Sequence, residues 1–375
     1  MRNSRLYGRL LIALLYLAQL WRPRRRPQTV RRVLILHRHL LGDTLMLTGL
    51  LAKLRAQYPA AELVMAGSGN FGSLYAGRPY GTDYLQFDIK RPDSLLAIRA
   101  RGPYELAILP AENRWGTTAR ALGARWVVGF ADEQPARRNR ALDAARPYST
   151  VPTAWSDTAA ELIDGPLPPP YRAGDWPAPG CKPFERPATR YCVLHVGTSA
   201  SLKLWAPERW QALATQLEAT GLTPVWSGGP GEERLIAECD PAGKWRSYAG
   251  QLDLTQAWHL VADAALLVSV DTSIAHLGRI VGTPTVALFG QGSALLCGAG
   301  HFWRDTPFEA ISVDVPCRDQ IRNFARLIPW IRRCERLPGT GDGQCARAIC
   351  MEGIDVNQVQ HAIARLLATR PAETA

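Results

Sequence analysis

Residues 265–289 read ALLVSVDTSIAHLGRIVGTPTVALF. The first six are apolar except for one serine, a pattern that indicates a strand covered on both faces of a parallel sheet. Apolar side chains then recur at helical spacing over residues 272–281, and a second apolar run follows at residues 284–289. This order predicts a strand, a crossover helix and a parallel strand, which together form a βαβ unit.

The same alternation extends over most of the chain. Two series of strands and helices are separated by residues 166–187, which contain eight prolines and no apolar period and therefore predict a linker over residues 166–189. Predicted strands are residues 33–36, 62–66, 84–87, 106–109, 126–128, 191–196, 223–227, 265–270 and 284–289. Predicted helices are residues 44–57, 92–100, 113–122, 207–219, 232–239, 255–262 and 272–281.

These elements predict an α/β protein with two Rossmann-like, doubly wound domains that face each other across an interdomain cleft. We expect a first domain at residues 31–165 and a second at residues 190–350, with a leader of residues 1–30 before them and a helix and tail at residues 351–375. Ligands of open α/β sheets bind at the carboxyl ends of the strands. The loops that follow the predicted strands are therefore the candidate site.

The 375 residues carry 44 basic and 33 acidic side chains, a formal charge of +11. The excess is confined to residues 1–32, which hold nine arginines and no acidic residue, so that the remaining chain has 35 basic and 33 acidic side chains, or +2. A nucleic-acid-binding protein spreads its positive charge over a folded face. We therefore expect a nearly neutral body with a basic leader and no nucleic-acid partner.

The leader contains one apolar stretch, residues 10–18, followed by Trp21 and four arginines within residues 22–26. This stretch is about half the length of roughly 20 residues that spans a bilayer, and no small-residue cleavage site follows it. Two interpretations remain. The leader is an amphipathic helix that lies in the plane of an anionic membrane at its cytoplasmic face, or it packs on the body or a partner with solvated arginines.

The chain has eight cysteines, 2% of its residues, which favours reduced thiols. Four of them occur in the last sixty residues, at intervals that do not form paired CxxC zinc knuckles. Metal binding, disulfides and free thiols all remain open for Cys317, Cys334, Cys345 and Cys350.

The first strand is followed by the loop HRHLLGDT at residues 37–44. Gly42 permits the close approach of a ligand, and Asp43 either caps the following helix or presents a carboxylate base to a substrate. No GxGxxG motif follows the strand, which disfavours a dinucleotide-binding dehydrogenase.

Three loops after strands of the second series suit a nucleoside diphosphate. The loop after residues 191–196 offers hydroxyls and an ammonium group for phosphate. The loop after residues 223–227 offers bare glycine backbone for a nucleoside and a carboxylate for ribose, and the loop after residues 265–270 opens a helix whose amino end favours an anion. The candidate residues are Thr198, Ser199, Lys203, Gly228, Gly229, Glu232, Asp271, Thr272, Ser273 and His276.

At these motifs the sequence resembles the ADP-heptose:lipopolysaccharide heptosyltransferases of glycosyltransferase family 9. The resemblance extends over most of residues 31–300 and is most specific in the Gly42-Asp43 loop and in the segments KLWAPERW at residues 203–210, DTSIAHL at residues 271–277 and GTPTVALFG at residues 282–290. It implies the GT-B fold, with two Rossmann-like domains.

The resemblance also implies a reaction: inverting transfer of heptose from ADP-heptose to a lipopolysaccharide core or related glycolipid, without a metal or other cofactor. It implies Asp43 as the general base and a donor pocket built from the candidate residues of the second series. It places the protein on the cytoplasmic side of the inner membrane, soluble or peripheral, which agrees with a membrane-binding leader.

Two other functions remain open: a non-catalytic nucleotide-sugar-binding protein and a nucleotide-sugar 2-epimerase of the same architecture. We expect acceptor specificity in the first domain, on loops at residues 68–75 and 112–118. There Arg114 is either a contact to a phosphate or carboxylate of the acceptor, together with Gly42, or a solvated loop residue.

Overall fold

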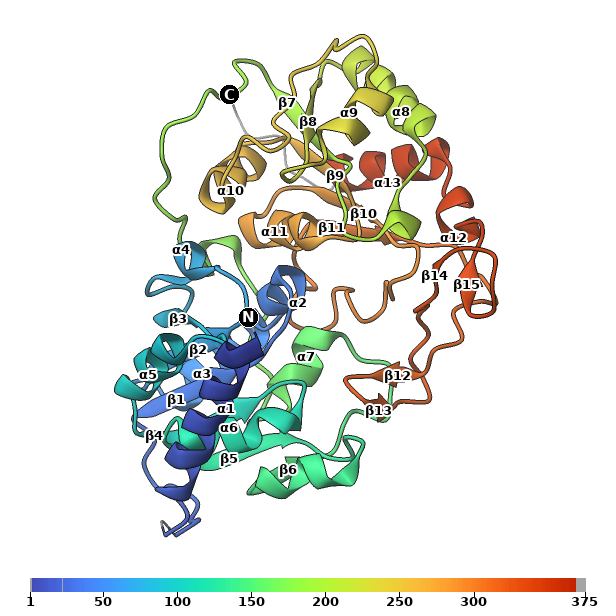
Figure 1. Cartoon of the computed structure of the whole chain (residues 1–375). Helices are drawn as coiled ribbons and strands as arrows, with labels where there is room; N and C mark the ends of the chain where they lie inside the picture. Colours follow the sequence, from blue (N-terminus) through green and yellow to red (C-terminus); the bar gives the residue numbers. More distant parts are fainter. Residues whose placement is uncertain (1, 22, 369–375) are drawn as a thin grey trace. The chain divides into compact units, whose positions relative to one another are not determined.

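The computed structural model describes residues 2–21 and 23–368. The chain forms two compact units (Figure 1). Unit 1 contains the residues up to Pro169 and the segment Arg322–Trp330, and unit 2 contains Pro170–Ile321 and the residues from Ile331 onwards. Of the predicted leader and tail, Met1, Arg22 and residues 369–375 lie outside the described residues.

Unit 1 is built on a six-stranded sheet in the order β3-β2-β1-β4-β5-β6, in which every pairing is parallel. This is the Rossmann strand order, and it reverses direction between β1 and β4. The strands are β1 (Arg32–Leu36), β2 (Glu62–Gly67), β3 (Thr82–Gln86), β4 (Tyr104–Leu109), β5 (Ala124–Phe130) and β6 (Ala144–Arg146). The helices are α1 (Arg2–Leu17), α2 (Leu41–Met46), α3 (Thr48–Gln57), α4 (Gly72–Tyr75), α5 (Pro92–Ala100), α6 (Gly116–Ala121) and α7 (Trp155–Ala160), with 3-10 turns η1 (Asn113–Trp115) and η2 (Ala136–Ala141).

Unit 2 is built on a five-stranded parallel sheet in the order β11-β10-β9-β7-β8. This is the other common doubly wound order, with its reversal between β7 and β9. The strands are β7 (Tyr191–His195), β8 (Thr223–Ser227), β9 (Leu266–Val270), β10 (Thr285–Leu288) and β11 (Phe308–Ile311). The helices are α8 (Pro207–Ala219), α9 (Glu233–Cys239), α10 (Leu254–Ala262), α11 (Ser273–Val281), α12 (Ile349–Glu352) and α13 (Val356–Ala368), with 3-10 turns η3 (Ala173–Asp175) and η4 (Ser201–Lys203).

Helices cover both faces of the unit 2 sheet, which explains why its strands read as unbroken apolar runs. On one face, α8 and α13 contact each other and bury Leu213 and Val359 against the sheet residues Leu194 and Val268. On the other face, α11 packs on β9 and β10, and Ala275 lies in one apolar cluster with Ala287 of β10 and Phe289. The predicted two Rossmann-like units are therefore confirmed.

The sequence-based boundaries are close for most elements and wrong at identifiable places. The helix predicted at residues 44–57 is two helices, α2 and α3, that meet at Leu47. Strands β6 and β11 were not predicted, because β6 has three residues with an arginine among them and β11 contains Glu309 and is only half-buried.

The leader forms α1, which packs against α5 and α6 of unit 1. Ile12 is buried in the core cluster of this unit, and Leu15 and Tyr16 pack on its edge. Gly8 lies against the backbone of Ile89, where a larger residue would overlap its carbonyl oxygen. Packing on the body, one of the two interpretations of the leader, is therefore what the structure shows.

The segment Arg322–Trp330 returns to unit 1, although the sequence assigned it to a second domain at residues 190–350. It forms the hairpin β12 (Arg322–Asn323) and β13 (Arg326–Leu327), whose two-residue turn, Phe324 and Ala325, has positive φ at both positions. Two-residue hairpins favour this geometry but usually place Asn or Gly there. Two further short strands, β14 (Leu337–Pro338) and β15 (Gln344–Cys345), follow this segment in the chain and belong to unit 2.

Side-chain contacts of the hairpin stabilise this unusual turn. Arg326 is buried, and its guanidinium donates hydrogen bonds to the carbonyl oxygens of Ala111 at 2.6 Å, Phe130 at 2.9 Å and Ala131 at 2.7 Å. The ring of Phe324 packs against Trp155 at a centroid distance of 4.8 Å. These contacts offset the cost of two non-glycine residues in the left-handed region, which is of order 1–3 kcal/mol for each.

Gly278 sets how closely α11 approaches the sheet. A Cβ atom at this position would overlap Oγ1 of Thr285 and lie 2.7 Å from Cδ2 of Leu267. We expect Gly278→Ala to lower the free energy of unfolding by about 1–3 kcal/mol, the usual cost of overpacking, measured by urea unfolding. The matched control is Gly180→Ala, where a Cβ meets nothing within 4 Å, and a change within about 0.5 kcal/mol is expected. Equal stability of the two variants would contradict this account.

Candidate active site

The carboxyl ends of β7 and β9 bring two of the predicted donor loops together. Lys203, in η4 after β7, donates a hydrogen bond from Nζ to Oδ2 of Asp271 at 2.7 Å and another to the Asp271 carbonyl oxygen at 3.1 Å. Asp271 directly follows β9, and its side chain is only 10% exposed. The ion pair therefore bridges the two loops at the point where the strand order of the sheet reverses, which is where doubly wound folds bind ligands.

The amino end of α11 lies next to this ion pair. Thr272 is its N-cap residue, but no side chain caps the helix. The Oγ1 atom of Thr272 instead lies 3.2 Å from Oγ of Ser269, and Ser273 is half-buried at the first helical position. The first N–H groups of the helix and its positive dipole end are therefore available to an anion beside Lys203.

His276 lies one turn into α11 and is 5% exposed. Its Nδ1 atom is buried and has no hydrogen-bond partner in the part of the chain that the structure describes. Burial lowers the pKa of His276 well below its ordinary value, and the charges of Arg279 and Lys203 lower it further. The imidazole is thus neutral at pH 7 and presents an unused polar atom.

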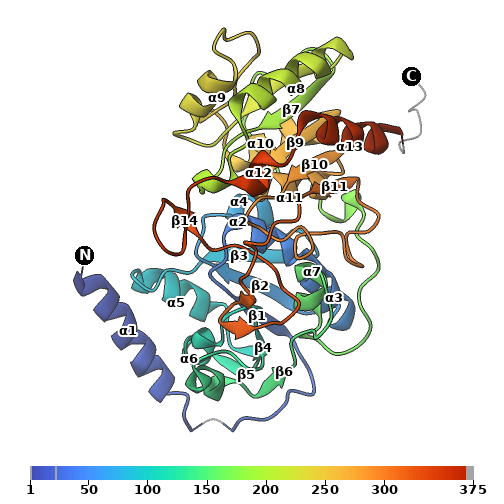
Figure 2. The ribbon, with the colours of Figure 1, turned by 90° about the vertical axis from the view of Figure 1, so that its right-hand side faces the viewer.

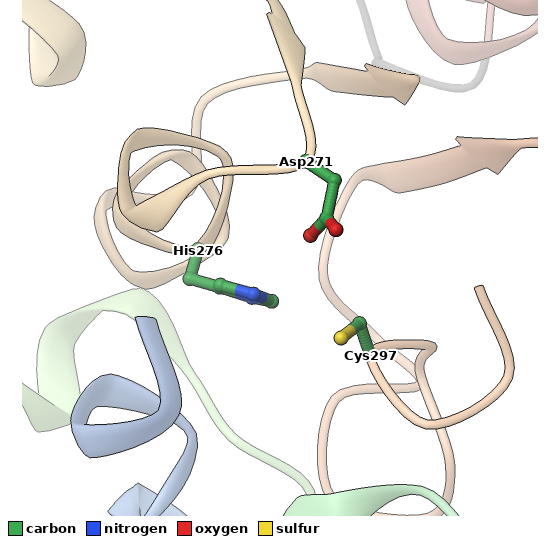
Figure 3. Close-up of side chains that lie close together, drawn as sticks. All are labelled: Asp271, His276 and Cys297. Carbon is green, nitrogen blue, oxygen red and sulfur yellow. The ribbon is translucent and has the colours of Figure 1, made fainter. Parts of the chain in front are cut away.

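Figure 3 shows His276, Asp271 and Cys297 pointing toward a common space. One ligand atom of each lies within 4.8 Å of the others, and this is the one such group of potential metal ligands among residues 2–21 and 23–368. Lys203 already neutralises the carboxylate, and the fully buried Arg279 lies nearby on α11. Two cations at this point disfavour a third positive charge.

The loop after β8 is closed by its own carboxylate. Oε2 of Glu232 accepts a hydrogen bond from the backbone N–H of Gly229 at 2.5 Å and lies over Gly197 and Gly228, where a Cβ would meet it. Glu232 therefore joins the loops after β7 and β8. This carboxylate already accepts a hydrogen bond within its own loop. Its predicted contact to ribose stays a prediction.

The two predicted hydroxyls differ in their surroundings. Thr198 is half-buried, and its Oγ1 accepts a hydrogen bond from the N–H of Ala200 at 3.4 Å. Ser199 is exposed. Both lie on the same loop as Lys203, so that the whole predicted donor set comes from the carboxyl ends of β7, β8 and β9, adjacent strands of the sheet.

Three buried polar side chains of unit 2 that support this edge were not predicted from the sequence. His195 and Ser227 are the last residues of β7 and β8, and Nδ1 of His195 lies 3.0 Å from Oγ of Ser227. Arg279 donates hydrogen bonds to the carbonyl oxygens of Cys297 at 2.9 Å and Gly298 at 3.2 Å, which fixes the loop opposite Asp271. The sequence could have indicated His195 and Ser227, because each is a polar residue at the end of an apolar strand. No local sequence pattern indicates that Arg279 is buried.

In unit 1, the loop after β1 leads into α2, with Gly42 and Asp43 in its first turn. The N-cap is Leu40, so the cap role considered for Asp43 is wrong. Asp43 is exposed, and a carboxylate in the first turn is favoured by the helix dipole. An exposed carboxylate at the carboxyl end of a central parallel strand is suitably placed to meet a substrate hydroxyl.

Two buried histidines precede Asp43 on this loop. The rings of His37 and His39 stack at 4.8 Å, and the Nε2 atoms of both are buried without a hydrogen-bond partner among the described residues. Burial lowers the pKa of His39 to about 4 and that of His37 well below its ordinary value. His39 also contacts the rings of Trp155 and Phe324 at 5.9 Å and 5.2 Å, so the returning hairpin helps to hold the loop.

Arg114 lines a basic pocket of about 360 Å³ in unit 1, with Arg9 from α1, Arg38 from the loop after β1, and Lys90. The guanidinium of Arg114 lies 4.8 Å above the ring of Trp115 and pairs with Glu112 at 2.8 Å, and that of Arg38 lies 5.6 Å from the same ring. The pocket thus adjoins the carboxyl ends of β1 and β4, where the strand order reverses. Arg114 is therefore part of a cationic cluster, and its contact to an acceptor stays a prediction.

A sequence profile of glycosyltransferase family 9 (heptosyltransferase) matches residues 115–302, half of the chain. The chain belongs to glycosyltransferase family 9. This confirms the resemblance inferred from the motifs. The matched region includes all of the donor loops described above and leaves Asp43 outside it.

Two curated relatives are similar to part of this chain. Lipopolysaccharide heptosyltransferase 1 of Pseudomonas aeruginosa is 27% identical over 194 residues, which is 48% of this chain and 54% of the relative. Lipopolysaccharide heptosyltransferase 3 of Escherichia coli is 26% identical over 141 residues, which is 35% of this chain and 40% of the relative. The chain thus matches about half, or less, of the length of these curated relatives.

The structure of the Escherichia coli heptosyltransferase WaaC with ADP is similar to this family 9 chain, with a TM-score of 0.65 and 17% identity over 89% of this chain and 99% of that chain. At this identity the similarity establishes the fold. The predicted GT-B class is therefore confirmed, and the interdomain cleft stays a prediction.

None of the eight cysteines of this family 9 chain, all of which lie within the described residues, forms a disulfide. Cys317, Cys334, Cys345 and Cys350 are thus free thiols in the structure, and Cys334 and Cys350 are buried. Burial raises the pKa of the Cys350 thiol, which keeps it protonated and unreactive.

The buried His195 predicts a specific pH dependence of stability. Burial lowers its pKa to about 4, while an unfolded histidine has a pKa near 6.5. As the pH falls from about 6.5 to 4 the unfolded state binds the proton first, so the free energy of unfolding falls by about 1.4 kcal/mol per pH unit for this group. We expect His195→Gln to remove that contribution in urea unfolding at pH 7, 6 and 5. The control His361→Gln, on the exposed face of α13, keeps the wild-type slope, and an unchanged slope for His195→Gln would contradict the assignment.

Proposed function

We propose that this family 9 protein is an inverting glycosyltransferase that moves heptose from ADP-heptose to a hydroxyl group of a lipopolysaccharide core or related glycolipid. The observation that carries the proposal is the Lys203–Asp271 ion pair beside the uncapped amino end of α11. A diphosphate leaving group needs this combination, a fixed cation and free backbone N–H groups at the end of a central strand.

The donor binds through groups of unit 2. Lys203 and the amino end of α11 hold the diphosphate, and the hydroxyls of Thr198 and Ser199 add hydrogen bonds to its oxygens. The half-buried Thr272 and Ser273 complete this cradle. The carboxylate of Asp271 accepts hydrogen bonds from hydroxyl groups of the donor, and the free Nδ1 atom of His276 makes a further hydrogen bond to the donor, whose direction follows the tautomer of the ring. Gly228 and Gly229 leave room for the nucleoside.

The reaction requires a base and a stabilised leaving group. The acceptor oxygen attacks the anomeric carbon, its proton passes to the carboxylate of Asp43, and the bond to the diphosphate breaks with the electron pair going to the phosphate oxygen. Attack from the side opposite the leaving group inverts the anomeric centre. Lys203 and the helix dipole stabilise the developing negative charge, which is usually the largest catalytic contribution.

The acceptor binds to unit 1. Arg38, Lys90 and Arg114 line the basic pocket next to the loop that carries Asp43, with Asp88 as its acidic member. Phosphate and carboxylate groups of a glycolipid core suit such a pocket, since guanidinium groups bind both in bidentate fashion. Gly42 allows the acceptor to approach the α2 end of this loop.

The proposed enzyme needs no metal, because Lys203 and the dipole of α11 take the part that a divalent cation plays elsewhere. It works on the cytoplasmic side of the inner membrane as a peripheral protein, where a lipid-linked acceptor and anionic phospholipid are present. No helix in the described part of the chain is long and apolar enough to cross a membrane.

Asp43→Asn tests the base. The amide has nearly the same shape but does not accept the proton, so we expect turnover to fall by roughly 10²–10⁴ while the dissociation constant for ADP stays unchanged. Transfer is measured with ADP-heptose and a deacylated lipopolysaccharide core acceptor.

The control is Asp93→Asn, an exposed carboxylate in the first turn of α5, which should retain full turnover. Full turnover of Asp43→Asn would remove that residue from the reaction. Binding of donor without transfer in the wild-type protein, to any core acceptor, would favour the non-catalytic alternative.

A thermal-shift series tests the donor. Ligand at 100 times its dissociation constant stabilises a protein by about 2.7 kcal/mol, so ADP should raise the melting temperature, whereas UDP and GDP at the same concentration should not. Lys203→Gln loses a charge-assisted contact worth about 1.5–3 kcal/mol, and the dissociation constant for ADP should rise roughly 10- to 100-fold.

The matched control is Lys244→Gln, whose side chain is half-exposed and pairs with Glu218 on α8; it should bind ADP as the wild type does. A shift with UDP or GDP compounds and none with ADP would overturn the assignment of the donor.

A further inference from the structure

The outer face of α1 and the residues after it form an unusually apolar surface. The leucines of this face recur at intervals of three and four residues, which places them on one side of a helix. Leu14 is 65% exposed, and Trp21, just beyond the helix, is 93% exposed. The exposed apolar residues of this surface, which we name the leucine face, are Leu6, Tyr7, Leu10, Leu14, Leu17, Leu20 and Trp21.

The opposite side of α1 is attached to unit 1. Ile12 is buried in the core of the unit, Leu11 and Leu15 pack against that core, and Gly8 lies directly on the backbone of Ile89. Figure 2 shows α1 at the outside of unit 1, next to α5 and α6. The leucine face therefore has a fixed orientation on a folded domain and is not part of a loose tether.

A second, cationic feature lies at the carboxyl end of this helix. A pocket of about 430 Å³ is lined by Leu20 and by the segment after α1, together with side chains from α6 and β5. Five of its lining residues are arginines, against one acidic residue, Glu105. Two of these arginines already have ion pairs, Arg26 with Asp164 and Arg120 with Asp143. Arg24, Arg25 and Arg125 are exposed and have no ion pair among the described residues.

We propose that the leucine face and this arginine pocket together bind the surface of an anionic phospholipid bilayer, with the leucines and Trp21 at the acyl boundary and the pocket around a lipid phosphate. This proposal rests on the proposed function, because a transferase that acts on a lipid-linked acceptor works at a bilayer. Exposed leucines with an interfacial tryptophan and adjacent arginines are the composition of helices that lie in a membrane surface.

Charge argues for lipid over a second copy of the chain. Residues 1–32 contain nine arginines and no acidic residue, so two copies docked through this surface would place like charges against each other. A bilayer with anionic headgroups offers an apolar layer and negative charge close enough together for one helix to contact both. The acidic groups nearest the pocket, Glu105 and Asp164, already bond to other residues of unit 1.

The same helix also reaches the proposed acceptor pocket. Arg9, on the border of the leucine face, lines the basic pocket that contains Arg38 and Arg114. A bilayer bound to α1 therefore lies next to the site that we assign to the anionic groups of the acceptor. This arrangement presents the headgroup of a lipid-linked acceptor to the enzyme without extracting the lipid.

Sedimentation with vesicles tests the apolar half of the proposal. Full-length protein is mixed with vesicles of phosphatidylcholine alone and with vesicles that contain 30% phosphatidylglycerol. We expect binding to the anionic vesicles, and a loss of at least tenfold in affinity for Leu10→Gln/Leu14→Gln. The control Leu327→Gln/Leu337→Gln changes two leucines that are 62% and 69% exposed elsewhere and should bind as the wild type does.

The charge half is tested with Arg24→Gln/Arg25→Gln, which should bind the anionic vesicles at least fivefold more weakly and with a weaker dependence on salt concentration. The control Arg137→Gln/Arg234→Gln removes the same net charge from other exposed positions and should have little effect. None of the four variants changes a buried residue, so the thermal unfolding of each should match that of the wild type.

Three results would overturn the proposal: no binding of the wild type to anionic vesicles, equal binding of the leucine variant and its control, or wild-type dimers that the leucine variant dissociates while vesicle binding is unchanged. The last result would assign the leucine face to a second copy. Neither donor nor acceptor is present in these assays, and ADP-induced stabilisation is measured separately. A failure of membrane binding is thereby distinguished from a failure of the proposed transferase activity.

Discussion

Every strand pairing in the two main sheets is parallel, and the location of the chemistry depends on this constraint. A parallel sheet places all carboxyl ends of its strands at one edge, and a reversal of strand order leaves the loops there free to diverge around a ligand. In unit 2 the Lys203–Asp271 ion pair lies at that reversal. In unit 1 the loop with Asp43 and the pocket with Arg114 lie at the equivalent reversal. Two sheets of different strand order thus follow the same rule.

Much of this could be predicted from the sequence because parallel strands covered on both faces leave a strong local pattern. Residues 223–227 and 207–219 have the predicted bounds of β8 and α8, since apolar runs, a proline at the first helical turn and flanking turns all indicate the same boundaries. The donor loops could be predicted for the same reason: each directly follows such a strand. The weak elements are those with little apolar content, such as β6, or a break in an otherwise helical pattern, as at Leu47.

The remaining features depend on contacts between residues far apart in the sequence. Nothing near Arg326 indicates that its guanidinium binds carbonyl oxygens of Ala111 and Phe130, and a Phe-Ala pair is not a typical turn for a two-residue hairpin. The unpartnered nitrogen of His276 and the stacked pair of His37 and His39 also appear only in three dimensions. For the leader, composition indicated an apolar and basic segment, but only the packing of Gly8 and Ile12 shows which side of the helix remains exposed.

The returning hairpin has a consequence for how the protein is made. Unit 1 is discontinuous in the chain, because Arg322–Trp330 packs within it. On the ribosome, the residues up to Pro169 emerge long before Arg326 does, so the carbonyl oxygens that this side chain binds stay without their partner while the segment Pro170–Ile321 of unit 2 is synthesised. Unit 1 therefore begins to fold first but cannot complete its fold until most of unit 2 has been made, and a chain that ends at the proline-rich linker lacks a buried part of unit 1.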